Sequence, residues 1–220
     1  MRDGNLVILL LNVLEHPEDP TPRCILGDWL EDCGDPRAVS VRKHCQTGNI
    51  YFRSGTLSGS AGVVHLAIQL VPQPLAVEFG CCCAEHALPV FAREFPNDDR
   101  PQSLTATVRN WLWGEATKTE VRRQLRLMSD VTDEEAAMPQ AGQVWSREQE
   151  AARYAAVCAA RSAAAAALAV SFPQKSNKWE QWVSQAALEA VAAAGQRAAE
   201  MEWQRREFLK LLMQGRQAHN

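Results

Sequence analysis

Residues 83–114 begin CAEHALPVFAREFPNDDRP and end WLWG, and this stretch decides how the chain folds. Apolar side chains recur in its first part at the spacing of one helix face, so it predicts an amphipathic helix. Pro96 ends that helix, because proline lacks the backbone N–H that the next turn needs. Residues 97–99, Asn-Asp-Asp, supply caps for a second helix, and Gly114 suits the position that ends it. The stretch therefore predicts two helices joined by a sharp acidic turn.

Two parts of this stretch, CAEHALPVF at residues 83–91 and FPNDDRP at residues 95–101, resemble the signature of a bacterial family of putative immunity proteins. The likeness continues in general character, though not residue by residue, from about Leu75 through an Ala-rich run to the segment EWQRR. That segment is similar to the family's C-terminal helix. The resemblance implies a helical domain with Ala-rich helices after the signature. It does not identify a target.

The N-terminal part predicts three short helices. Apolar residues from Leu6 to about His16 favour a first helix, and Thr21 followed by a proline is typical of the start of a second. Gly34 ends the second helix, and Asp-Pro then starts a third that reaches about Cys45. Three short helices bury little surface, so we expect this module to dock on something larger.

Residues 17–42 resemble the bacterial repeat-companion domain, a small helical module found beside other domains. The matching residues are Pro22-Arg23, Asp28-Trp29-Leu30-Glu31-Asp32 and Gly34-Asp35-Pro36-Arg37-Ala38. Gly27 and Val39-Ser40 depart from the pattern of that domain. We therefore predict an acidic repeat-companion-like module at residues 1–48, a Gly/Ser-rich connector at 49–62 and an immunity-protein-like helical domain at 63–220.

The second half of the chain is rich in alanine. Thr117 and Ser146 stand three residues before Glu120 and Gln149, which is the spacing of a capping box at the start of a helix. Alanine has the highest helix propensity, so the Ala-rich tract predicts a closely packed helical hairpin rather than disorder. Interspersed charges argue against a membrane helix. Residues 63–71 alternate like a strand but have no partner strand, so helix and extended structure both stay open.

Composition is that of an ordinary globular protein, with 46% hydrophobic and 22% charged residues among 220. The net charge of −3 lies entirely in residues 1–48, which carry five basic and eight acidic side chains. Such a module favours a basic partner surface. The seven cysteines are odd in number and three are adjacent, which disfavours a disulfide framework and indicates a cytoplasmic protein.

Candidate site residues fall into three groups. For binding a protein partner, the candidates are Asp28, Glu31, Asp32, Asp98 and Asp99; a structural reading of the last two is that one caps a helix while Arg100 pairs with a carboxylate. For nucleic acid, which is the alternative, the candidates are Lys118, Arg122, Arg123 and Arg126, which follow one face of a helix. A third hypothesis is an enzyme built on His86 with Cys82 or Cys83 and Glu85.

Together these patterns predict an all-α protein: a small three-helix module packed on or tethered to a larger bundle that contains the Ala-rich hairpin. The resemblance to both families implies a non-catalytic interaction protein, either an immunity protein or inhibitor, or an adaptor, in a bacterial toxin or defence system. Its partner would be another protein, such as a toxin, an effector or a complex subunit. We expect no metal, no cofactor and no membrane partner.

Overall fold

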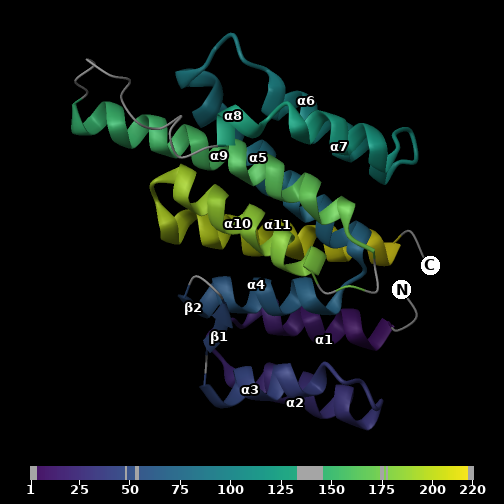
Figure 1. The fold of residues 1–220 in the computed structure, drawn as a ribbon. Coiled ribbons are helices and arrows are strands. Elements are labelled where there is room, and N and C mark those ends of the chain that lie inside the picture. The colour runs from purple at the N-terminus through teal and green to yellow at the C-terminus, as the bar shows by residue number, and fades with distance from the viewer. Residues whose placement is uncertain are drawn as a thin grey trace. The chain divides into compact units, whose positions relative to one another are not determined.

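A computed structural model of the chain describes residues 4–47, 49–52, 55–132, 146–173, 176 and 178–217. These residues are almost entirely helical, which confirms the predicted all-α class (Figure 1). The chain divides into two compact units, one formed by Met1–Pro72 with Met201–Asn220 and the other by Gln73–Glu200. The predicted modules with boundaries at residues 48 and 62 follow composition rather than these contacts, and they stay a prediction.

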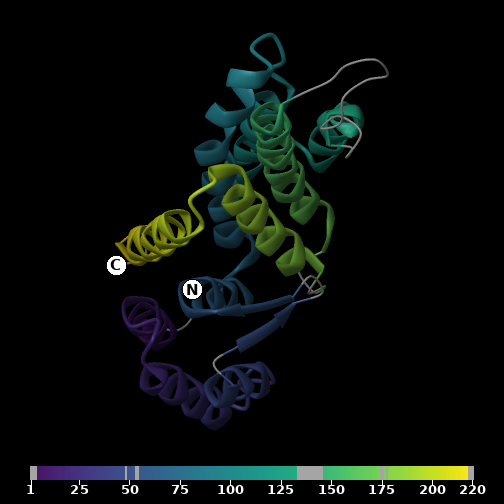
Figure 2. The same cartoon turned by 90° about the vertical axis from the view of Figure 1, so that its left-hand side faces the viewer.

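The first unit contains a helical hairpin, a pair of packed helices and a short two-stranded sheet. Its helices are α1 (Gly4–Glu15), α2 (Pro20–Asp32), α3 (Ala38–Thr47), α4 (Gly59–Leu70) and most of α11 (Arg197–Gln217). Helix α1 packs on α2 and α4, and α2 packs on α3 (Figures 1 and 2). The core consists of the apolar faces of these helices, with Leu10, Leu26, Leu30 and Leu66 fully buried.

Helix α11 is tied to α1 by a polar contact inside this unit. Arg205 donates from Nη1 to the carbonyl oxygen of Leu14 at 2.5 Å, close to the end of α1. Glu202, one turn earlier on α11, receives two hydrogen bonds from the same guanidinium and so fixes its direction. The pairing holds the pKa of Glu202 at about 2, because both Arg205 and Arg206 stabilise its charged form.

The structure differs from the sequence-based expectation at two places in the first unit. The N-cap of α2 is Asp19, whose carboxylate accepts from the backbone N–H of Thr21, so the predicted N-cap at Thr21 was wrong. A carboxylate two residues before a backbone N–H makes this bond readily, and Pro20 then fits the first helical position. The predicted connector carries regular structure: strands β1 (Asn49–Phe52) and β2 (Gly55–Ser58) pair antiparallel, and α4 begins at Gly59.

The second unit is a bundle around alanine-rich helices. It contains α5 (Gln73–Glu94), α6 (Arg100–Leu112), α7 (Lys118–Arg126), α8 (Ser129–Thr132), α9 (Arg147–Ser171) and α10 (Lys178–Ala194). Helix α9 packs along both α10 and α5, which confirms the predicted Ala-rich hairpin (Figure 1). A Cβ added at Gly80 of α5 would lie 3.4 Å from the Cβ of Ala166, so small residues let these helices approach closely.

Helix ends in the second unit follow the predicted local signals. Thr117 and Ser146 each form a complete capping box, at the starts of α7 and α9. Gly114 has φ +79°, a left-handed conformation that other residues rarely adopt, directly after α6. Thr132 and Glu135 have the same capping-box spacing in the sequence, but residues 133–135 lie outside the described residues. Local backbone chemistry therefore accounts for most helix boundaries here.

Two helices, α5 and α9, are long and apolar enough to cross a membrane by length and composition alone. However, 56% and 72% of their respective apolar windows are buried inside the fold. Core helices of soluble proteins have the same properties, so these two helices are weak indications of a membrane span. The expectation of no membrane partner stays a prediction.

Candidate protein-binding surface

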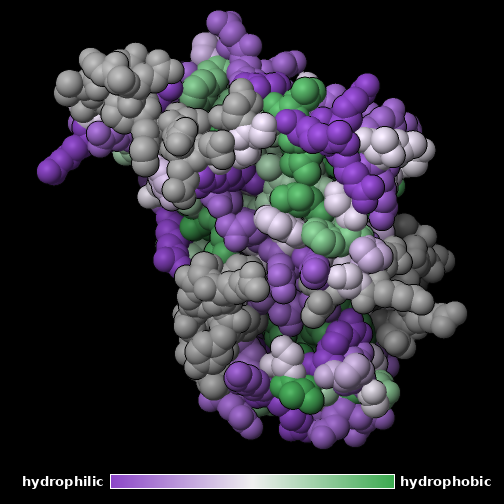
Figure 3. Space-filling view, in the orientation of Figure 1, coloured by the Kyte–Doolittle hydropathy of each residue, from purple (hydrophilic) through white to green (hydrophobic). Residues whose placement is uncertain are grey.

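The first candidate surface lies on α2. Asp28, Glu31 and Asp32 are all exposed and stand three and four residues apart, so they share one face of the helix. In Figure 3 the surface over α2 and α3, at the bottom of the view, is mostly hydrophilic, with isolated hydrophobic side chains. Ile25 and Val39 are among the large apolar side chains exposed in this hairpin. A polar, carboxylate-bearing face suits a reversible contact with a charged partner.

An arginine on the neighbouring helix belongs to this face, and the sequence analysis missed it. Arg42 of α3 contacts the carboxylate of Asp28 at 2.7 Å and forms an ion pair and hydrogen bond with Glu31. Pairing with the two acids raises the pKa of Arg42. The side chains of Asp28 and Glu31 remain 62% and 61% exposed, so both keep a large part of their surface open to a partner.

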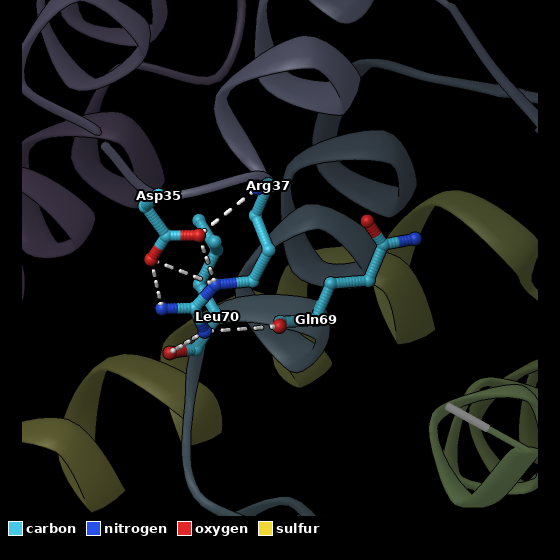
Figure 4. Close-up of polar contacts among 4 residues, drawn as sticks. All are labelled: Asp35, Arg37, Gln69 and Leu70. Atoms are coloured by element: carbon cyan, nitrogen blue, oxygen red, sulfur yellow. Dashed lines mark hydrogen bonds and ion pairs between the residues drawn. The ribbon is translucent and has the colours of Figure 1, made fainter. Parts of the chain in front are cut away.

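Residues of the turn before α3 anchor the hairpin on α4. Gly34 has φ +67° and ends α2, and Asp35 then accepts from the backbone N–H of Arg37. Arg37 forms a two-pronged pair with Asp35 and donates through Nη1 to the carbonyl oxygens of Gln69 and Leu70 at 3.5 and 3.2 Å (Figure 4). These carbonyls are the unpaired acceptors at the end of α4, where a cation is stabilising.

This anchor gives a physical account of the segment Gly34-Asp35-Pro36-Arg37-Ala38, on which part of the repeat-companion resemblance rests. Each polar residue of the segment has a structural partner inside the first unit. The Arg37 pair holds the pKa of Asp35 below its ordinary value, mainly through the side-chain hydrogen bond. The acidic face is therefore carried by a hairpin whose position on α4 is fixed.

The second pair of predicted binding residues, Asp98 and Asp99, lies between α5 and α6. Asp98 accepts from Arg100 through both carboxylate oxygens, at 2.9 and 2.6 Å, and from the backbone N–H of Arg100. Arg100 also donates to the carbonyl oxygen of Leu127 at the end of α7. Asp99 occupies the N-cap position of α6 without a capping bond from its side chain. The predicted pairing of Arg100 with a carboxylate is therefore present, whereas Asp99 at the N-cap position makes no side-chain cap. Partner binding at this turn stays a prediction.

The alternative, nucleic-acid face on α7 is partly engaged inside the second unit. The ammonium of Lys118 lies 5.8 Å above the ring of Trp111, and Arg122 donates to the carbonyl oxygen of Ser171 at the end of α9. Arg123 and Arg126 are exposed. Two of the four predicted cations thus have intramolecular roles, and nucleic-acid binding stays a prediction.

The candidate enzyme residues Cys82, Glu85 and His86 do not form one site, because Cys82 and Glu85 contact one partner and His86 contacts another. Arg109 of α6 binds both oxygens of Glu85 at 2.7 Å and donates to the sulfur of Cys82 at 3.4 Å. His86 instead contacts the buried carboxylate of Glu200, with Nε2 3.1 Å from Oε2. Bidentate guanidinium–carboxylate pairs are strong and directional, so Arg109 acts as a cross-link between α5 and α6. Sequence reasoning missed Arg109, since nothing in its local sequence distinguishes it.

Among the residues that the structure describes, no group of three or more His, Cys, Asp or Glu side chains is arranged to hold a metal ion. Burial raises the pKa of the Cys81 thiol, which makes this neighbour of Cys82 a poor nucleophile. The polar clusters of both units thus consist of ion pairs, helix caps and helix-to-helix hydrogen bonds. They define a helical protein with charged, solvent-exposed surfaces.

The chain is similar to a known family over part of its length. Residues 67–130 match the family described as "Imm-5 like putative immunity protein", which confirms the predicted resemblance to a putative immunity-protein family. The matched segment includes the end of α4 and all of α5, α6 and α7. Comparisons with curated proteins and with solved structures gave no match. The repeat-companion resemblance of residues 17–42 stays a prediction.

Proposed function

We propose that this chain is a non-catalytic immunity or adaptor protein that binds a basic surface of another protein through the acidic face of α2. The family match over residues 67–130 is consistent with a role in protein interaction. The observation that carries the proposal is the face itself: Asp28, Glu31 and Asp32 are exposed on one side of a hairpin that Arg37 anchors on α4. Cytoplasmic location and a role in bacterial defence are part of the same proposal.

The negative charge of this face determines that a favoured partner carries basic residues. Residues 1–48 carry three more acidic than basic side chains, eight against five, whereas the remainder is balanced. A partner that presents lysines or arginines would be steered toward α2, and its association rate would fall as salt screens the attraction. Toxins that act on nucleic acids commonly present basic surfaces, because they must approach phosphates.

The test is a pull-down from cells that express the full chain, followed by affinity measurements on each captured protein. The face variant changes three acids to their amides, Asp28→Asn with Glu31→Gln and Asp32→Asn. The control variant makes the same change in charge at Glu115, Glu148 and Glu150, which are also exposed.

We expect a captured partner to bind the face variant at least about tenfold more weakly than the control variant, which corresponds to about 1.4 kcal/mol. Equal affinities of the two variants for every captured protein would refute the proposal. Binding that is lost equally in both variants would indicate a response to net charge rather than to this face, and would also count against it.

A further inference from the structure

The backbones of α2 and α3 approach closely at a glycine. A Cβ added at Gly27 would lie 3.3 Å from Cγ of Arg42 and 3.5 Å from Cγ1 of Val41, with the backbone nitrogen of Arg42 at 3.9 Å. The same helices meet at Asp28 and Glu31, which contact Arg42. Helix α2 ends at Asp32 and α3 begins at Ala38, so a turn of only five residues joins these two packed helices, and they are therefore antiparallel.

Two cysteines lie one helical turn from this close approach. Cys24 precedes Gly27 by three residues on α2, and Cys45 follows Arg42 by three residues on α3. Residues three apart share a face of a helix, so in an antiparallel pair the two cysteines face each other. Their thiols lie within hydrogen-bonding reach of one another, with Cys24 exposed and Cys45 half-buried.

We propose that Cys24 and Cys45 are a peroxide-responsive dithiol that closes into an intramolecular disulfide across the α2–α3 hairpin. A disulfide requires Cα atoms about 4.4–6.8 Å apart, which packed helices reach only where a small residue allows close contact. Gly27 supplies that condition one turn away. The proposal rests on this geometry and is independent of the proposed function.

The surroundings of the two thiols determine which one reacts first with hydrogen peroxide. Burial and the hydrogen bond with Cys24 raise the pKa of Cys45 to about 12, against the opposing effect of Arg23 and Arg42, so Cys45 is the less reactive thiol. The Cys24 thiolate attacks one oxygen of hydrogen peroxide, the O–O bond breaks, and Cys24 becomes a sulfenic acid as hydroxide leaves.

Cys45 then loses its proton, and its sulfur attacks the sulfur of the sulfenic acid. The S–O bond breaks and the second hydroxide leaves. Each hydroxide takes up one of the two thiol protons, so two thiols and one peroxide give one disulfide and two molecules of water. The two thiols are oxidised and the peroxide is reduced, so the step needs no other reactant.

Cys33 provides a matched control on the same helix. It is exposed, as Cys24 is, but it stands at the C-cap of α2 on the turn side of the hairpin, nine residues from Cys24. Cys81 and Cys83 are buried in the second unit. An oxidant that reacts by exposure alone would modify Cys33 and Cys24 equally, whereas closure of a dithiol requires Cys45.

The test treats the folded full chain with hydrogen peroxide, blocks remaining thiols with N-ethylmaleimide in denaturant, and digests with trypsin. Cleavage after Arg23 and Arg37 releases peptide 24–37, and cleavage after Lys43 and Arg53 releases peptide 44–53. We expect these two peptides to be joined, with loss of two hydrogen atoms and of two of the seven alkylatable thiols. The joined peptide should persist in Cys33→Ser and vanish in Cys24→Ser and Cys45→Ser.

The proposal is overturned if the disulfide uses Cys33, if it joins two chains, or if Cys24 proceeds to sulfinic acid without a link to Cys45. Peroxide treatment in denaturant supplies the comparison, since an unfolded chain pairs its thiols without the selectivity of the folded hairpin. Should Cys24→Ser or Cys45→Ser fail to fold, which circular dichroism reports, mapping the disulfide in the wild-type and Cys33→Ser chains still decides the question.

Discussion

Lowering the pH should unfold the first unit before the second, because the first unit buries two uncharged histidines. His44 and His65 are 2% and 6% exposed, and burial lowers the pKa of each from 6.5 to about 4. The charge of Arg23 lowers the pKa of His44 further, and His44 does the same to His65. Among the described residues, neither ring nitrogen of His44 has a hydrogen-bond partner. A proton that enters the His44 ring therefore gains no compensating hydrogen bond there.

The sign and size of the change in the free energy of unfolding with pH follow from the linkage between proton binding and folding. A histidine whose folded pKa is depressed contributes stability that is fully present above about pH 6.5 and is lost as the pH falls toward 4, since the unfolded chain binds more protons. With the pKa at 6.5 unfolded and about 4 folded, each histidine lowers the free energy of unfolding by about 2 kcal/mol between about pH 7.5 and pH 5. The two together remove about 4 kcal/mol, a large part of the stability of a typical domain.

Urea unfolding at several pH values measures this loss for each unit separately. In a chain labelled with 5-fluorotryptophan, Trp29 of α2 reports on the first unit and Trp179 of α10 on the second through their ¹⁹F resonances. The variant His44→Leu removes two buried nitrogens without a described partner, so it should cost little at neutral pH and should halve the loss at pH 5. The exposed His16→Gln should keep the full loss.

A Trp29 transition whose free energy changes by less than about 1 kcal/mol between these pH values would refute the argument, because the linkage of two buried neutral histidines requires more. So would a His44→Leu chain that loses as much stability as the wild type. If the Trp179 transition moved by the same amount, the responsible groups would lie outside the histidine cluster.

Three further substitutions test the second unit by urea or thermal unfolding. Arg109→Ala should lower the free energy of unfolding by about 1–2 kcal/mol, since it removes the two-pronged bond to Glu85. Arg109→Lys should recover only part of the lost stability, and equal stability of the wild type and both variants would contradict a cross-linking role. Ala166→Leu should cost about 1–3 kcal/mol by overpacking against Gly80, and a neutral result would mean that α5 and α9 have room to separate. Thr117→Ala should cost about 1 kcal/mol through loss of the capping box, whereas Thr117→Ser should be nearly neutral.

The parts of the fold that could be predicted from sequence are those that depend on one or two neighbouring residues. Pro96 ends a helix because of its own covalent structure, and Gly114 adopts a positive φ that alanine would resist. Thr117 and Ser146 satisfy backbone N–H groups within their own first turns. Such signals need no tertiary information, which is why the helix boundaries of the second unit were predicted well. The wrong N-cap of α2 shows the limit, since Asp19 and Thr21 are both good caps and the chain uses only one.

The parts that could not be predicted depend on which elements pack together. Arg42 and Arg109 have ordinary sequence neighbours, and their roles arise only when α3 lies against α2 and α6 against α5. Asp28, Glu31 and Asp32 are exposed on one face of α2, but the counter-ion of Asp28 and Glu31 comes from a separate helix. Likewise, Gln73 is buried because its amide donates to the carbonyl oxygen of Ala169, 96 residues away. Helical periodicity indicates which residues of one segment share a face, but it cannot indicate such long-range partners.

The ion pairs of Arg42 bear directly on how the acidic face would bind. A basic partner must either replace Arg42 at Asp28 and Glu31 or add its charge around these two residues and Asp32. Ion pairs as exposed as these contribute little to stability, so exchanging one guanidinium for another costs little. Meanwhile Arg42 keeps the two carboxylates in fixed positions in the free protein, which reduces the ordering that binding requires. A face arranged in this way favours fast, salt-sensitive association with a partner that offers several cations, and it discriminates against a partner that offers only one.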